Sequence, residues 1–159
     1  MVFRLGIKTR IMEKTKKKKN VFVEGAISST FIGESIGKHQ SKTDIGAHDI
    51  FLGQVRADNI DGKEVVAIEY SAYSEMAENI FHEIREATFA KYDLSCMHIY
   101  HSTGIVRTGE ICLFVFVSAA HRQEAFDAIR FLVEEIKAKV PIFGKELFED
   151  GEHVWKKNS

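Results

Sequence analysis

Residues 122–140 read RQEAFDAIRFLVEEIKAKV, and this segment decides the fold class more clearly than any other part of the chain. Its apolar residues recur every three or four positions, which places them on one face of an α-helix. Pro141, the only proline in the sequence, follows where a helix usually ends. The segment therefore predicts a long amphipathic helix that packs on a core through Ala125, Ile129, Leu132, Val133, Ile136 and Val140.

The chain before this helix alternates between strand-like and helix-like patterns. Segments rich in β-branched and aromatic residues predict strands at 21–23, 48–56, 64–73, 95–101 and 110–118. The turn-forming residues 59–62 favour a hairpin between the second and third of these strands. Ser28 or Ser29 can cap a short helix through Ile32 and Ile36. Ser74 starts a longer helix, whose apolar side is formed by Ala77, Ile80, Phe81, Ile84 and Ala87.

The region after Pro141 predicts a C-terminal hairpin. Asp150-Gly151 is a strong turn signal between strands at 145–149 and 152–156. Hairpins mixed with two long helices are typical of the α+β class, so we expect a mainly antiparallel sheet.

Length and charge narrow the function classes. The 159 residues suit one domain, which we place at 21–159. Residues 1–20 hold eight basic residues and one acid, and their lysine run 16–19 predicts a disordered basic tail. Met12 is an alternative start. The chain has 22 basic and 23 acidic residues in total, so 21–159 keeps 14 and 22. This acidic balance argues against a nucleic-acid partner.

The cysteines and the hydropathy pattern bear on location. Cys96 and Cys112 lie apart in apolar runs, so we expect two buried free thiols in a reducing compartment. The sequence contains no apolar run of the roughly 18–20 residues that a membrane helix needs. It also shows no signal-peptide core. We therefore expect a cytoplasmic protein without a membrane partner.

Cationic residues near the predicted long helix suggest an anion site. Arg122, Arg130 and Lys137 fall within an arc of roughly 80° on that helix. Their side chains can share a groove, or they can extend separately from an exposed helix flank. His121 lies where backbone N–H groups attract anions. Arg56, at the end of a strand, can donate two hydrogen bonds to a phosphate or be an ordinary surface arginine.

Several chemical classes lack support in the sequence. His98 and His101 are three residues apart on a strand, so they face opposite sides and are not expected to share a zinc ion. There is no nucleotide-binding glycine motif, no GxSxG and no Walker loop. We therefore predict no metal site.

Several motifs together resemble the catalytic (large) subunit family of molybdopterin synthase. The most specific is SAAHRQEAF at 118–126, which continues into Ile136-Lys137 and Val140-Pro-Ile-Phe143. The resemblance spans about residues 46–156. Its other motifs are HDIFLGQVR at 48–56, VVAIEYSAYSEMA at 65–77, Gly104 with Gly109-Glu110, and DGEHVW at 150–155.

The resemblance implies a particular fold, assembly and reaction. It implies an α/β hammerhead fold and a homodimer that becomes a heterotetramer with a small ubiquitin-like sulfur carrier. The partner's C-terminal Gly-Gly tail would end in a thiocarboxylate that supplies the sulfur, so no cofactor would be bound permanently. The substrate would be cyclic pyranopterin monophosphate, and the product molybdopterin.

The resemblance also implies roles for individual residues. Lys137 matches the essential lysine, and Lys145 is the expected second catalytic lysine, because the usual basic residue is replaced by Gly144. His101-Ser102 is a second departure, where the family commonly has His-Arg. The implied substrate-binding residues are Gln54, Val55, Arg56, His121, Arg122, Lys137, Gly144, Lys145 and Glu146, with Phe51, Arg130 and Val133 as candidates for the pocket wall.

Two alternatives remain open at the level of sequence. The Gly144 departure allows a non-catalytic or weakly active scaffold that binds the partner tail or an anionic ligand. A small anion-sensing regulatory domain would bind a phosphate ligand without affinity for a ubiquitin-like tail.

Overall fold

The structure is a computed structural model, and residues 19–157 are described here. Most of the predicted basic tail at 1–20 lies outside these residues. Along the chain, the elements are β1 (Phe22–Glu24), α1 (Ser29–Gly37), β2 (Ala47–Gln54), β3 (Asn59–Ile60), β4 (Lys63–Ala72), α2 (Ser74–Lys91), β5 (Cys96–Arg107), β6 (Ile111–Ala119), α3 (Arg122–Lys139), β7 (Ile142–Phe148) and β8 (His153–Trp155).

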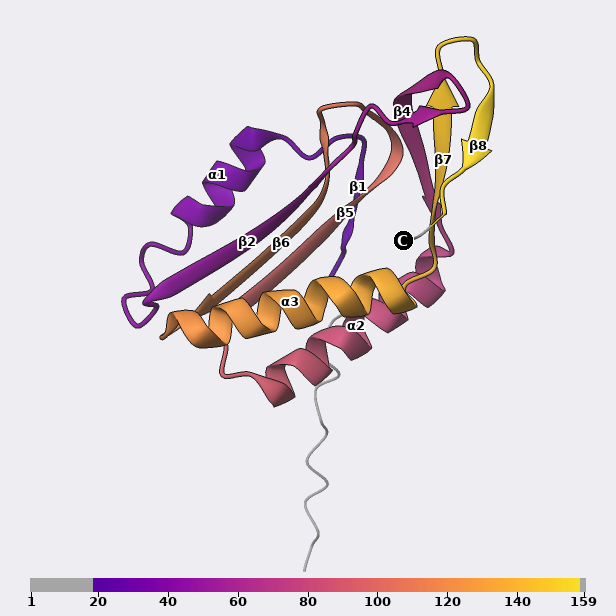
Figure 1. Ribbon diagram of the computed structural model, residues 1–159. Coiled ribbons are helices and arrows are strands. Elements are labelled where there is room, and N and C mark those ends of the chain that lie inside the picture. The colour runs from indigo at the N-terminus through magenta and orange to yellow at the C-terminus, as the bar shows by residue number, and fades with distance from the viewer. Residues whose placement is uncertain (1–18, 158–159) are drawn as a thin grey trace, which may run out of the picture.

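The described strands form one eight-stranded sheet with the order β2-β6-β5-β4-β7-β8. β3 pairs with β4, and β1 adds to β5 as the parallel pair in an otherwise antiparallel sheet. Figure 1 shows the β4, β7 and β8 end of the sheet standing at an angle to the β2, β6 and β5 part. The predicted α+β class with a mainly antiparallel sheet is confirmed.

The predicted hairpin between 48–56 and 64–73 is wrong. β2 pairs with β6 along its whole length, whereas β4 lies between β5 and β7. The turn at 59–62 does form, but it joins β4 only to the two-residue strand β3. Asp61 and Gly62 take positive φ angles of 51° and 82° there, as a tight turn of this kind requires. A turn signal identifies the local reversal, but it does not show how far the pairing continues.

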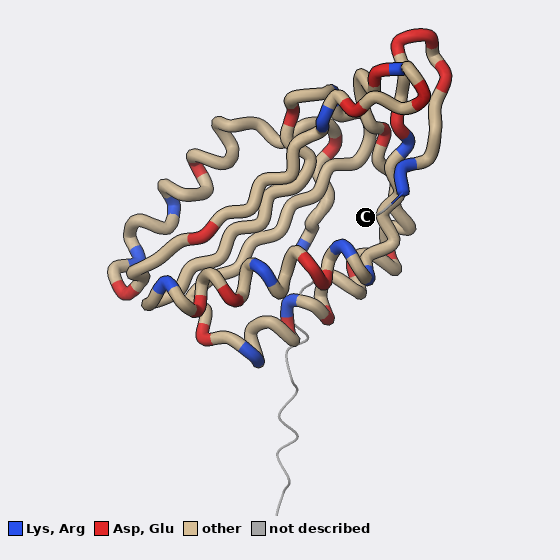
Figure 2. The backbone as a smooth tube through the Cα atoms, viewed as in Figure 1, with Lys and Arg blue, Asp and Glu red and all other residues tan. Residues whose placement is uncertain are grey.

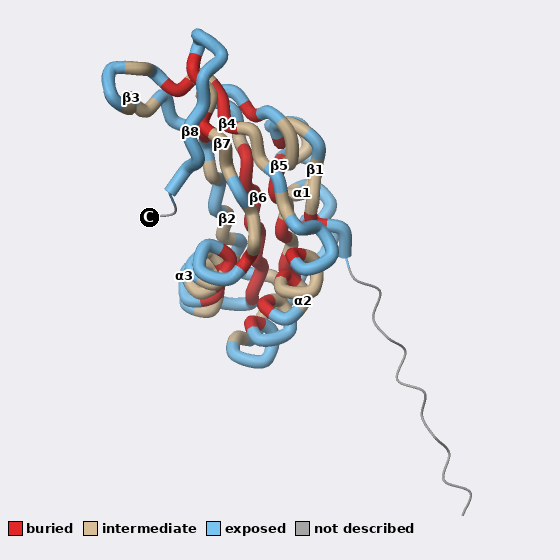
Figure 3. Tube along the Cα trace, turned by 90° about the vertical axis from the view of Figure 1, so that its right-hand side faces the viewer, coloured by how far each residue is buried: buried red, intermediate tan, exposed pale blue. Residues whose placement is uncertain are grey.

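The helices lie on both faces of the sheet. α2 and α3 pack together over one face, and α1 covers the other (Figure 1). β6 contributes side chains to the packing on both faces of the sheet, because alternate residues of a strand point to opposite sides. Val115 and Val117 join the α2–α3 core, whereas Phe114 and Phe116 pack toward α1. Figure 3 shows the resulting buried layer between exposed outer surfaces.

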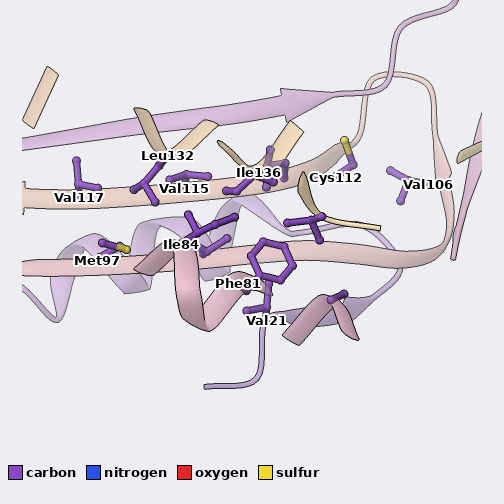
Figure 4. Packing of buried hydrophobic residues seen from close by; sticks show 14 of the residues in the cluster. Val21, Phe81, Ile84, Met97, Val106, Cys112, Val115, Val117, Leu132 and Ile136 are labelled. Carbon is purple, nitrogen blue, oxygen red and sulfur yellow. The ribbon is translucent and has the colours of Figure 1, made fainter. Parts of the chain in front are cut away.

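The main core explains why α2 and α3 form. Phe81, Ile84, Leu132 and Ile136 from the two helices meet β-strand residues in Figure 4. The predicted apolar side of α3 is confirmed, with Ile129 and Val133 packed at its margin. On α2, Thr88 is buried in place of the predicted Ala87, because it lies one turn beyond Ile84 and donates its hydroxyl to the Ile84 carbonyl.

The helix ends follow local chemistry. Ser28 caps α1 by accepting a hydrogen bond from the Phe31 backbone at 3.1 Å, as predicted. α3 ends at Lys139, and Val140 is already extended before Pro141. This sharp end directs the chain into β7 and fixes where the last turn of α3 meets the sheet. No helix of the described residues is long and apolar enough to cross a bilayer.

Candidate functional site

A narrow cavity of about 40 Å³ lies where the last turn of α3 meets β4, β5 and β7. Lys137 enters it from α3, and Tyr70 and His101 enter it from β4 and β5. Its remaining lining residues are Ile136, Val140, Ile142, Gly144 and Lys156. The cavity therefore combines apolar walls with two ammonium groups, an arrangement suited to a small anionic group.

The ammonium of Lys137 is affected by this setting. The residue as a whole remains exposed, but partial desolvation lowers its pKa, and the charge of Lys156 lowers it further. The nearby Cys112 acts in the opposite direction. Neither Arg122 nor Arg130 is a cause of this shift, although both share the helix with Lys137.

His101 forms the buried side of the cavity. Its Nδ1 lies 2.8 Å from the Ser102 carbonyl oxygen, so Nδ1–H donates and Nε2 remains an acceptor. The ring is 4% exposed and packs edge to face on Tyr70 at 5.1 Å. Burial and the charge of Lys137 lower the pKa of His101 to about 4, against the hydrogen bond to Ser102. The imidazole is therefore neutral at physiological pH.

Tyr70 completes the polar lining. Burial, together with contact with Cys112, raises the pKa of its phenol far above the usual value, so the hydroxyl keeps its proton. The cavity thus contains a neutral imidazole and a neutral phenol beside cationic lysines. Such groups can orient a ligand without adding negative charge.

A broader hollow of about 480 Å³ adjoins this cavity. Arg56 and Glu146 line it, and Lys156 lines both the hollow and the cavity. Arg56 is largely exposed, and its guanidinium lies 3.3 Å from Asp58. Because exposed ion pairs contribute little, this arginine is available to an incoming anion. The other lining residues are Ile60, Val154, Trp155 and Lys157.

His121 and Arg122 lie in a third hollow with Gly46, Ala120 and Gln123. Arg122 begins α3, whereas Lys137 lies in its last turns. At about 1.5 Å per residue, the two are about 22 Å apart along the helix axis. Of the two arrangements that the sequence left open, the shared groove therefore does not form within one chain, because a common angular position on a helix says nothing about axial distance. The exposed Arg130 lies between Arg122 and Lys137 on the helix, and it lines neither the Lys137 cavity nor the hollow with Arg122.

Gly144 and Lys145 are neighbours in β7 and therefore face opposite sides of the sheet. Gly144 lines the Lys137 cavity, while Lys145 Nζ lies 5.3 Å from the centre of the Trp155 ring. Adjacent residues of a strand point to opposite faces, so a small backbone shift cannot bring Lys145 to Lys137. The geometry thus leaves the expected second catalytic lysine outside this cavity.

The remaining predicted site residues divide between surface and core. Val55 is 2% exposed, and its backbone pairs with Gly109 and Glu110, so it supports Arg56 without lining a hollow. Gln54 is exposed at the end of β2. Phe51 is 37% exposed and lies opposite Val115, on the α3 side of the sheet. Val133 packs against the core.

The described residues also bring together one group with metal-ligand chemistry, formed by His39, Cys96 and His98. His39 and His98 join through their Nε2 atoms at 2.9 Å. His39 Nδ1 lies 2.7 Å from the Ser35 carbonyl oxygen, so its Nε2 accepts from His98. Lys42 donates to the Cys96 sulfur at 2.8 Å. These groups already satisfy one another beside a cation, so the arrangement does not favour a divalent metal ion.

Cys96 and Cys112 are both buried and free, as predicted. His98 faces the α1 side with His39, while His101 faces Lys137, so the predicted opposition of the two histidines is confirmed. Sequence reasoning did not identify Tyr70, His101 or Lys156 as residues of this site. For Lys156 the sequence signal is misleading, because counting outward from a two-residue Asp150-Gly151 turn sets it opposite Lys145, whereas the observed register sets it opposite Gly144.

The fold and the site define a class: an α+β domain in which lysine and arginine side chains line adjoining hollows. The family model for the MoaE protein matches residues 27–139. The chain therefore belongs to the MoaE protein family.

Individual relatives agree with this assignment. The molybdopterin synthase catalytic subunit of Rattus norvegicus is 36% identical over 113 residues, which cover 71% of this chain and 56% of the relative. The chain thus spans little more than half the length of that curated relative. A crystal structure of molybdopterin synthase from Staphylococcus aureus matches with a TM-score of 0.75 and 30% identity, covering 86% of this chain and 96% of the other.

A further solved structure shares the fold at lower identity. It is a complex of subunits 1 and 2 of the molybdopterin-converting factor from Helicobacter pylori, with a TM-score of 0.73 and 18% identity. The match covers 86% of this chain and 89% of that chain.

Proposed function

We propose that this chain is the catalytic subunit of a molybdopterin synthase, a sulfurtransferase that converts cyclic pyranopterin monophosphate into molybdopterin. The observation that carries the proposal is the position of Lys137, in a narrow cavity that adjoins the larger hollow of Arg56. The cavity suits the end of an extended peptide, and the hollow suits a bulkier phosphorylated ring. This arrangement supports a reaction between a protein tail and a pterin phosphate.

The sulfur donor in this proposal is a small ubiquitin-like partner whose Gly-Gly tail ends in a thiocarboxylate. At one carbon of the pterin substrate the thiocarboxylate sulfur displaces the phosphate oxygen, so that the cyclic phosphate opens to a monoester; at the neighbouring carbon a second thiocarboxylate adds to the carbonyl, whose oxygen leaves as water. Water then cleaves each acyl–sulfur bond and releases the partner as a carboxylate. Two activated partners supply the two sulfurs. The chain needs no reactive cysteine for this chemistry, and Cys96 and Cys112 are both buried.

Lys137 suits the role of the principal acid, base or charge-stabilising residue. Protonated, its ammonium stabilises the negative charge that develops as the sulfur attacks and the cyclic phosphate opens. Its lowered pKa also makes the neutral, basic form more accessible than for an exposed lysine. The uncharged His101 and Tyr70 beside it can hold the donor group in place.

A homodimer accounts for the second group of predicted binding residues. A single pterin phosphate cannot span the separation of about 22 Å between Arg122 and Lys137 along one helix. In the proposed assembly, His121 and Arg122 of one copy complete the Arg56 and Lys137 site of the other. With one sulfur carrier on each copy, the complex is a heterotetramer.

The direct test mixes the purified chain with the thiocarboxylated partner and cyclic pyranopterin monophosphate, and measures the dithiolene product. Product formation that depends on all three components is expected. Binding of the partner tail without turnover would overturn the enzymatic proposal and favour the scaffold. Binding of a phosphate ligand without affinity for the tail would favour the anion-sensing domain.

A further inference from the structure

Lys156 occupies a position that the expected set of catalytic residues leaves unexplained. It directly follows β8, and its backbone N–H donates to the Gly144 carbonyl at 2.7 Å. This bond extends the β7–β8 ladder, in which Lys145 pairs with Trp155 and Glu146 with Val154. Gly144 and Lys156 are therefore directly opposite each other across the two strands.

The side chain of Lys156 lies on the cavity face of this ladder. A Cβ built on Gly144 would lie 3.5 Å from the Lys156 Cβ and 3.5 Å from the Tyr70 ring. Residues opposite each other in an antiparallel pair share one face, so the missing side chain of Gly144 leaves room beside Lys156. Figure 2 shows the matching basic segments at the last turn of α3 and at the chain end after β8.

Charge and position distinguish Lys156 from its neighbours. It lines the Lys137 cavity and the Arg56 hollow, and it is the lysine that the two have in common. Among residues 19–157, no carboxylate forms an ion pair with Lys137 or Lys156. Two ammonium groups therefore face one small cavity without a counterion from the described part of the chain, and an anion is the complementary ligand.

We propose that Lys156 is a substrate-binding residue of the Lys137 cavity, where the two ammonium groups together hold the anionic end of a peptide tail. This inference rests on the proposed function, since the tail is that of the sulfur carrier. The narrow cavity fits the carboxylate or thiocarboxylate at the end of the peptide tail, whereas the larger hollow with Arg56 fits the pterin phosphate. Lys156 then supplies, from the position directly after β8, the positive charge that Gly144 does not supply from β7.

The first test measures tail binding without chemistry. Calorimetry with the partner in its carboxylate form should show about 10- to 100-fold weaker binding for Lys156→Met, the range for losing a charge-assisted hydrogen bond. Lys139→Met is the matched control, because it removes a lysine of the last α3 turn that pairs with Glu135. A partner without its last two residues should bind the wild type and Lys156→Met equally. Unchanged tail binding in Lys156→Met would overturn the inference.

The second test separates Lys156 from Lys145 and from the proposed reaction itself. In turnover, Lys156→Met should raise the KM for the thiocarboxylated partner about tenfold or more and leave the KM for the pterin nearly unchanged. Loss in Lys145→Met with normal behaviour of Lys156→Met would assign the role to Lys145 and reject the inference. A wild type that binds the tail but makes no product would reject the proposed function and leave the binding result valid.

A relocation variant addresses the geometry. Gly144→Lys combined with Lys156→Gly moves the ammonium to the facing strand and should recover part of the lost tail affinity. The Ile68 methyl lies 3.1 Å from the new Cβ position and must shift slightly. Circular dichroism and thermal melting confirm that each variant is folded. Recovery in a folded double variant supports a requirement for charge in this cavity, and no recovery argues that Lys156 acts otherwise.

Discussion

His101 and Lys137 line one cavity from β5 and α3, and the charge of the lysine helps to keep the histidine neutral. Burial is the larger cause, and together they lower the pKa of His101 to about 4. The folded protein therefore resists protonation of this ring, whereas the unfolded chain takes up the proton near pH 6.5. The site is built for a neutral imidazole beside a lysine.

The pH dependence of stability follows from this difference. Between pH 6.5 and 4 the unfolded state binds more protons than the folded state, so stability falls as the pH decreases. His101 alone contributes a slope of at most about 1.4 kcal/mol per pH unit. Urea unfolding at pH 7.5, 6 and 5 measures the slope. His101→Gln should flatten it, even if its overall stability is lower, and an unchanged slope would contradict the assignment.

Lys137→Met should separate activity from stability. Loss of the ammonium removes charge stabilisation in the transition state, and we expect turnover to fall about 100-fold or more. The folded state lowers the pKa of this lysine, so the charged form costs stability at neutral pH. Thermal melting of Lys137→Met should therefore show a melting temperature equal to or slightly above that of the wild type. Normal product formation with saturating thiocarboxylated partner would exclude Lys137 from the chemistry.

A mixing experiment tests whether two copies share each site. Arg122→Ala and Lys137→Met should each be inactive alone. If sites form between copies, random exchange makes half of the dimers mixed, and each mixed dimer has one intact site of two, so about a quarter of full activity returns. Activity of 1:1 mixtures after subunit exchange measures this. No recovery, with exchange confirmed by mass spectrometry, would indicate that Arg122 and Lys137 serve separate sites.

The sequence allowed helix faces and helix caps to be predicted, but not the pairing of strands that lie far apart in the chain. The spacing of Leu132 and Ile136 fixes the buried side of α3, and Ser28 fixes the start of α1, because both depend on neighbours within one helix. The partner of β2 depends instead on β6, more than fifty residues away. The turn at 59–62 favoured the nearer strand and led to the wrong hairpin.

The same distinction holds for the candidate site, where some residues could be predicted from the sequence and others depend on tertiary structure. The family resemblance identified Lys137 and Arg56, and both line adjoining cavities. Helical periodicity grouped Arg122 with Lys137 by angle but could not account for the rise along the axis. Lys156 lies far from Lys137 in the sequence and enters the cavity through β8 pairing, a tertiary relationship that residue patterns alone do not express.

Gly46 offers a test of how the start of α3 is held. Its N–H donates to the Ala119 carbonyl at 3.0 Å, and it lies in the hollow with His121 and Arg122. A Cβ on Gly46 would lie 2.2 Å from the Ala120 carbonyl oxygen, so the backbone must move. Gly46→Ala should lower the free energy of unfolding by about 1–3 kcal/mol, the usual range for overpacking. It should also raise the KM for the pterin by displacing His121 and Arg122.

Gly33→Ala is the control for this substitution. Gly33 lies within α1, and a Cβ there has no neighbour within 4 Å, so alanine should stabilise the helix by about 0.5–1 kcal/mol. Urea unfolding of both variants measures the contrast. If Gly46→Ala were as stable as the wild type, the approach of the Ala120 carbonyl would not restrain this junction. The position of His121 and Arg122 would then depend on the packing of α3 alone.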